Sequence, residues 1–178
     1  MIIDNSYFQG NLNIPNSQDA LTPLSDRRGN LVNLEDYIAK YERQVMIYAL
    51  GLTLYNDFIT SFESNGDLIP GPQLRWENFI NGTEYTTDGV DYEWKGLRYE
   101  EGSQKYSLIA NYVYSKFLPD ISSTLGSAGV QRNNAKSSKG YSSIPRTIEA
   151  WNEFIYKYQG NALDEDTVQI VTRPGLTG

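Results

Sequence analysis

The stretch NLEDYIAKYERQVMIYALGLTLYNDFITSF, residues 33–62, decides the fold of this chain. Apolar and aromatic residues recur in it at three- and four-residue spacing, the period of one helix face: Leu34, Ile38, Tyr41, Val45, Ala49, Leu52, Tyr55, Ile59 and Phe62. Asn33 is an N-cap residue, and Glu35 and Asp36 place negative charge at the positive end of the helix dipole. The pattern predicts one amphipathic helix of about 40 Å at about 1.5 Å per residue. Gly51 in its middle indicates a kink or a close-packing point.

Downstream of this helix, the sequence predicts three more helices and a hairpin. A short helix ends at Asn81-Gly82, a third covers about 103–118 and stops at Pro119, and a last one covers about 146–159. Between the second and third helices, residues 84–94 predict a β-hairpin, because alternating residues flank an Asp-Gly turn.

Three segments lack a sustained apolar period and are rich in polar residues. Residues 1–32 predict an N-terminal extended arm, about 119–145 a long loop, and 161–178 a C-terminal tail that includes a short possible strand. The central region, 33–160, is then the folded domain. The expected class is α+β, mainly α: a small helix bundle with a β-hairpin insertion and long arms and loops.

Composition argues against catalysis. The chain has neither Cys nor His, which excludes disulfide frameworks, zinc ribbons, iron–sulfur clusters and most triad hydrolases. Its net charge of −7 repels a phosphate backbone. We therefore expect no enzyme activity, no cofactor and no sequence-independent nucleic-acid binding. The longest apolar stretches are short and broken by polar residues, so we also expect no membrane partner.

Aromatic residues are abundant: 14 Tyr, 6 Phe and 3 Trp. Helical spacing favours core packing for the tyrosine-rich faces, of which one carries Tyr37, Tyr41, Tyr48 and Tyr55 and another carries Tyr106, Tyr112 and Tyr114. The number exceeds what a small core needs, which favours a subunit that completes its burial against neighbours.

Two alternatives from other classes stay open. A carbohydrate-binding module would use Trp76, Tyr92 and Trp94 as an aromatic stacking platform. A glycosidase would use Glu93 and Glu101 as paired carboxylates, although acids in turns and hairpins are most often only solvated.

Several motifs, in a fixed order, resemble the neck proteins of crAss-like and related Bacteroides tailed phages. They are Asn33-Leu34-Glu35-Asp36-Tyr37-Ile38, Tyr41-Glu42, Leu50-Gly51, Trp76-Glu77-Asn78-Phe79-Ile80-Asn81-Gly82, Trp94-Lys95-Gly96-Leu97, Ile109-Ala110-Asn111-Tyr112-Val113-Tyr114 and Glu149-Ala150-Trp151-Asn152. The resemblance spans about residues 33–155.

The resemblance implies a structural virion protein, a head-tail connector or portal adaptor subunit. Its partners would be further copies of itself in a ring of twelve, the portal protein, and adjacent ring or tail proteins. Genomic DNA would pass through without specific binding, which an acidic wall favours. The protein would be made in the host bacterial cytoplasm and would lie in the neck of the virion.

By this analogy, the extended segments are the expected partner contacts. The residues are Tyr7 and Phe8 in the arm, Arg132, Lys136, Lys139 and Tyr141 in the loop, and Val168, Ile170 and Val171 in the tail. Extended segments gain affinity from backbone hydrogen bonds to a neighbour.

Overall fold

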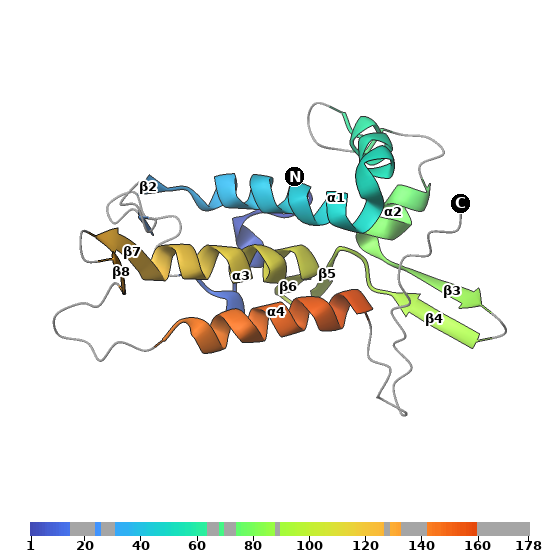
Figure 1. Cartoon of the computed structure of the whole chain (residues 1–178). Coiled ribbons are helices and arrows are strands. Elements are labelled where there is room, and N and C mark those ends of the chain that lie inside the picture. The colour runs from blue at the N-terminus through green and yellow to red at the C-terminus, as the bar shows by residue number, and fades with distance from the viewer. Residues whose placement is uncertain are drawn as a thin grey trace.

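Three helices lie side by side in one layer, and a shorter helix lies at one end of that layer (Figure 1). The computed structural model describes residues 1–14, 24–25, 31–63, 68–69, 74–87, 90–126, 129–132 and 142–159. The fold is α+β and mainly α, as predicted. Its helices are α1 Leu34–Thr60, α2 Leu74–Asn81, α3 Leu108–Ser122 and α4 Ile144–Gln159.

Helix α3 is the centre of the layer. It packs between α1 and α4, and its residues 108–115 are all buried. Ile109, Val113 and Phe117 have no exposed surface. A helix with apolar residues on every side is stable only when neighbouring elements bury every side. Helix α3 is therefore the element around which α1 and α4 assemble.

Helix α1 begins where the sequence predicts. Asn33 caps it, because its side-chain oxygen accepts a hydrogen bond from the Glu35 amide at 3.0 Å. Gly51 interrupts it with φ 75° and ψ 163°, and a Cβ built there would have no atom within 4 Å. Gly51 is therefore a kink and not a close-packing point. Beyond it, residues 52–60, which we call the projecting end, turn away from the layer (Figure 1).

Aromatic rings attach α2 to the projecting end. Phe58 lies 5.1 Å from Trp76 and 4.9 Å from Phe62, ring centre to ring centre. The helix ends at Asn81, as predicted, and Gly82 follows with φ 96°. A Cβ on Gly82 would lie 2.5 Å from the carbonyl oxygen of Trp94, so only glycine allows this close approach.

The strands form four separate two-stranded antiparallel pairs in the described part of the chain. They are β1 Leu24–Ser25 with β2 Leu31–Val32, β3 Thr83–Thr87 with β4 Val90–Trp94, β5 Arg98–Glu101 with β6 Gln104–Ser107, and β7 Ser123–Gly126 with β8 Gly129–Arg132. The pair β3–β4 confirms the predicted hairpin, with Tyr85 opposite Tyr92.

The helix predicted over 103–118 has different ends in the structure. Residues 104–107 form β6, and α3 begins only after Ser107, whose hydroxyl accepts a hydrogen bond from the Ile109 amide. At the other end α3 continues through Pro119 to Ser122. Because the helix ends three residues after Pro119, the missing N–H affects only its last turn.

The N-terminal segment, residues 1–14, is not the predicted extended arm. It forms two 3-10 turns, η1 Asn5–Tyr7 and η2 Gly10–Leu12, and Ile2, Ile3 and Ile14 are buried in the core. The carboxylate of Glu42 accepts hydrogen bonds from the amides of Ile2 and Ile3 at 2.8 and 3.2 Å. Apolar burial and these two bonds explain why the segment folds back onto α1.

The range predicted as a loop, 119–145, contains helix and strand residues. It contains the end of α3, the pair β7–β8 and the start of α4. Pairing of strands joins main-chain groups and needs no apolar period, which explains why the sequence pattern missed it. Residues 133–141 of the loop and the predicted tail, 161–178, lie outside the described residues.

Candidate functional site

An aromatic groove runs between the three helices of the layer, with a volume of about 580 Å³. Its lining comes from α1, α3 and α4: Tyr41, Gln44, Val45, Tyr48, Ala49, Tyr112, Lys116, Trp151, Phe154 and Tyr158. We call this site the aromatic groove. Six of these ten residues carry aromatic rings, so the groove concentrates a large part of the aromatic excess noted in the sequence.

Helical spacing places these side chains on the three facing surfaces. Residues three, four and seven apart lie on the same face of a helix, and the α1 lining follows that spacing from Tyr41 to Tyr48. On α4, Trp151 and Tyr158 are likewise seven residues apart. The sequence predicted the tyrosine-rich faces, but it did not indicate which helices would pack against one another there.

Tyr112 of α3 forms the floor of the aromatic groove. Its ring centre lies 6.3 Å from that of Tyr41, 6.1 Å from that of Trp151 and 5.1 Å from that of Phe154. Burial raises the pKa of the Tyr112 hydroxyl above its usual 10.0, and the neighbouring Tyr48 and Tyr41 raise it further. Its ring therefore presents a neutral, fixed surface that joins the two walls.

Two polar side chains give the groove hydrogen-bonding and charged positions. Gln44 accepts a hydrogen bond from the Tyr112 hydroxyl at 3.3 Å and donates one to the Tyr48 hydroxyl at 3.0 Å. The Lys116 ammonium lies 5.1 Å from the centre of the Tyr112 ring and 4.9 Å from that of Trp151. Within the described residues Lys116 has no ion-pair partner, and no lining residue is an acid, so the groove combines aromatic surface with one positive charge.

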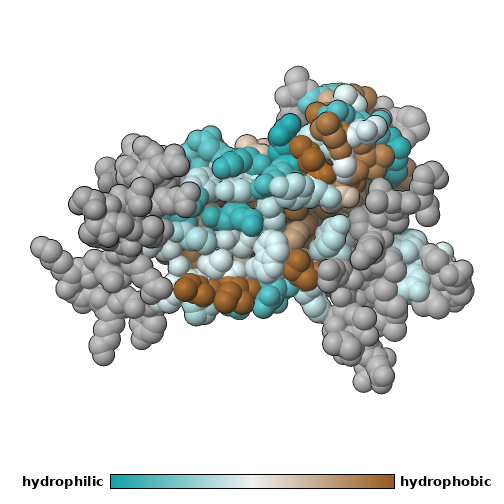
Figure 2. Space-filling model, in the orientation of Figure 1, coloured by the Kyte–Doolittle hydropathy of each residue, from teal (hydrophilic) through white to brown (hydrophobic). Residues whose placement is uncertain are grey.

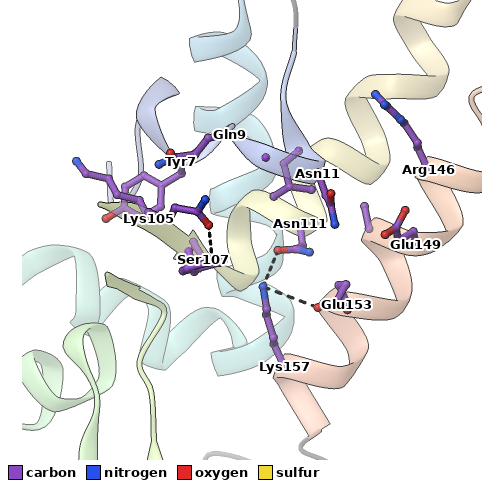
Figure 3. A pocket seen from close by; sticks show the side chains of 15 residues that line it. Tyr7, Gln9, Asn11, Lys105, Ser107, Asn111, Arg146, Glu149, Glu153 and Lys157 are labelled. Carbon is purple, nitrogen blue, oxygen red and sulfur yellow. Dashed lines mark hydrogen bonds and ion pairs between the residues drawn. The ribbon is translucent and has the colours of Figure 1, made fainter. Parts of the chain in front are cut away.

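A second, polar pocket of about 350 Å³ lies between α4, β6 and the N-terminal segment (Figure 3). Lys157 and Glu153 of α4 point there toward Asn111 of α3, and the Lys157 ammonium donates to the Asn111 side-chain oxygen at 3.2 Å. Burial lowers the pKa of Lys157 from its usual 10.5, against the opposite effect of Glu153. These contacts tie α4 to α3 behind the aromatic groove.

The structure places two of the predicted partner contacts in the core of the monomer and not on its surface. Tyr7 and Phe8 are only 7% and 6% exposed, because they are core residues of the N-terminal segment. Arg132 ends β8, where only the backbone is described. The remaining predictions lie outside the described residues: Lys136, Lys139, Tyr141, Val168, Ile170 and Val171.

The aromatic platform does not assemble from the three residues named for it. Trp76 is buried, and Trp94 stacks on Phe79 and donates its ring N–H to the Phe79 carbonyl at 2.8 Å. Glu93 and Glu101 do line one shallow hollow, but the Glu101 carboxylate lies 3.5 Å from the Lys95 ammonium. Sequence reasoning overlooked the aromatic groove as a site because it assigned the tyrosines one helix at a time.

Apolar side chains are uncovered at two places outside the groove (Figure 2). Along α4, Ile144 and Ile148 are about half exposed and continue the wall formed by Trp151. On the projecting end, Leu52 and Ile59 are 59% and 45% exposed. Soluble monomers usually leave such residues scattered singly, and clusters mark contact sites.

Within the residues that the structure describes, no group of His, Cys, Asp or Glu side chains is placed to hold a metal ion. No helix in this part of the chain combines the length and the apolar character needed to cross a membrane. No protein-family model, curated protein or solved structure matches the chain, so its function is inferred from its own residues.

Proposed function

We propose that this protein is a head-tail connector subunit of a tailed phage. Copies of it form a ring that joins the portal to the tail and continues the DNA channel, without catalysis. The observation that carries this proposal is the pair of uncovered apolar surfaces on α4 and on the projecting end.

Two different surfaces on one subunit favour a ring. When a surface on one copy meets a different surface on the next, the contact is head-to-tail, and such contacts close into rings or continue as filaments. The uncovered residues of α4 and those of the projecting end lie on separate elements. A twofold dimer would need only one self-complementary surface.

The sequence supports the particular kind of ring. The motifs that resemble phage neck proteins include residues of α1, α2, α3 and α4. A net charge of −7 also suits a channel wall along which DNA slides, because an acidic wall repels phosphate.

Light scattering tests this proposal. The purified protein is measured over a concentration series, alone and with the portal protein of the same phage. We expect a mass above 20.2 kDa at high concentration, and a complex of fixed stoichiometry with the portal. A protein that stays monomeric and ignores the portal would overturn the proposal. A tryptophan fluorescence change with polysaccharide would then favour the carbohydrate-binding alternative.

A further inference from the structure

We propose that the projecting end of one copy packs into the aromatic groove of the next copy. This inference rests on the proposed function as a ring subunit and specifies the contact that joins neighbours. The partner is therefore a second copy of this chain. The two sides of the contact are residues 52–60 of one copy and the groove between α1, α3 and α4 of the other.

The two surfaces match in length. Along α1 the groove runs from Tyr41 to Ala49, about 12 Å at about 1.5 Å per residue. The nine residues of the projecting end span the same length of about 12 Å. A groove with one helix as floor and two as walls is the shape that receives a further helix.

The chemistry of the two surfaces also matches. Leu52, Asn56 and Ile59 are exposed at positions i, i+4 and i+7 of the projecting end, the spacing by which a helix anchors in a groove. Leu52 and Ile59 would meet aromatic rings, and Asn56 would meet Gln44, whose side chain lies among the rings.

Charge favours the same pairing. Glu63 follows the projecting end, is exposed, and has no ion pair with another described residue. Lys116 in the groove is equally without a carboxylate partner in the described part of the chain. One acid and one base, each without an ion-pair partner among the described residues, thus lie on opposite sides of the contact.

The projecting end of one copy does not fill the groove of the same copy. The kink at Gly51 turns the projecting end away from the layer (Figure 1), and none of residues 52–60 lines the groove. Among the described residues, the two surfaces of one monomer therefore do not cover each other, which is what a head-to-tail contact requires.

Cross-linking between single-cysteine variants tests the contact. The chain contains no cysteine, so there is no background reaction. Ile59→Cys and Lys116→Cys are mixed in equal amounts with the portal and oxidised mildly. The matched controls are Thr53→Cys, on another face of the projecting end, and Ala39→Cys, on α1 outside the groove.

We expect disulfide-linked dimers in the mixture of Ile59→Cys and Lys116→Cys, several-fold more than when either control replaces its counterpart. Assembly with the portal but without this cross-link would overturn the inference and leave the proposed function standing. Dimers of Ile59→Cys alone, or a cross-link from Lys116→Cys to the portal, would also overturn it. Failure of the wild type to assemble with the portal would instead count against the proposed function itself.

Discussion

The two halves of α1 have the same apolar period but different surroundings. In the first half, residues 34–50, Ile38 and Val45 are buried in the core around α3. In the projecting end, Tyr55 and Phe58 are covered, whereas Leu52 and Ile59 remain open to solvent. An apolar period thus predicts a helix, but it does not indicate whether the apolar face is buried by the same chain or by a neighbouring copy.

The largest expected effect on stability comes from replacing Trp76, the α2 residue that packs against the projecting end. Trp76 is buried, and its ring packs against those of Phe58 and Phe79. We expect Trp76→Ala to lower the free energy of unfolding by about 3 to 5 kcal/mol in urea denaturation. The ring N–H of Trp76 is buried and has no hydrogen-bond partner among the described residues, so Trp76→Phe should cost much less. A loss below about 1 kcal/mol for Trp76→Ala would show that this cluster does not hold the end in place.

A matched pair of isoleucines compares the two halves directly. Ile38 has no exposed surface, whereas Ile59 is 45% exposed. Ile38→Ala should cost about 2 to 5 kcal/mol, and Ile59→Ala at most about 1 kcal/mol in the dilute monomer. Urea midpoints of both variants check this. Equal losses would mean that Ile59 is covered within the monomer in the same way as Ile38.

The kink that separates the halves should have an intermediate effect. At φ 75° and ψ 163°, Gly51 has a backbone conformation that is essentially restricted to glycine. Gly51→Ala should destabilise the kinked fold by about 1 to 3 kcal/mol, since the strain arises although the Cβ meets no atom. Thr53→Ala, an exposed helical position nearby, is the control and should change little. Similar stability of Gly51→Ala and wild type would show that α1 tolerates a straight form.

The smallest expected effect is on the pH dependence of stability. It comes from Glu42, which lies in the first half of α1 and binds the N-terminal segment. Burial raises the pKa of Glu42 above its usual 4.5, although the bonded amides of Ile3 and Ile2 act the other way. The folded protein therefore binds this proton more tightly than the unfolded one, so its contribution to stability is present below the unfolded pKa and is lost as pH rises through the raised pKa.

Glu42→Gln keeps an acceptor for these amides and removes the titration. We expect the variant to lose less stability than wild type as pH rises above 4.5. Urea midpoints across this range measure the difference. A steeper decline in the variant would contradict the assignment.

Local patterns sufficed for much of this fold. The period of residues 33–62, the Asn33 cap and the Asp-Gly turn predicted α1 and the hairpin β3–β4, both of which the structure confirms. These signals act within a few residues of the chain.

The sequence patterns did not predict features that depend on contacts between residues far apart in the chain. Burial of Ile2 depends on Glu42, 40 residues away, and β5–β6 consists mainly of polar residues with one stacked pair, Tyr99 and Tyr106. The aromatic groove needs α1, α3 and α4 together, so no single stretch of sequence indicates it.

In the proposed ring, subunits meet at the open face of the projecting end. Light scattering of wild type, Ile59→Asp and Thr53→Asp over one concentration series tests this contact. We predict that wild type and Thr53→Asp rise above the monomer mass of 20.2 kDa together, while Ile59→Asp stays at that mass with an unchanged helical circular dichroism spectrum. Association of Ile59→Asp at the same concentrations as wild type would show that subunits do not meet at this face.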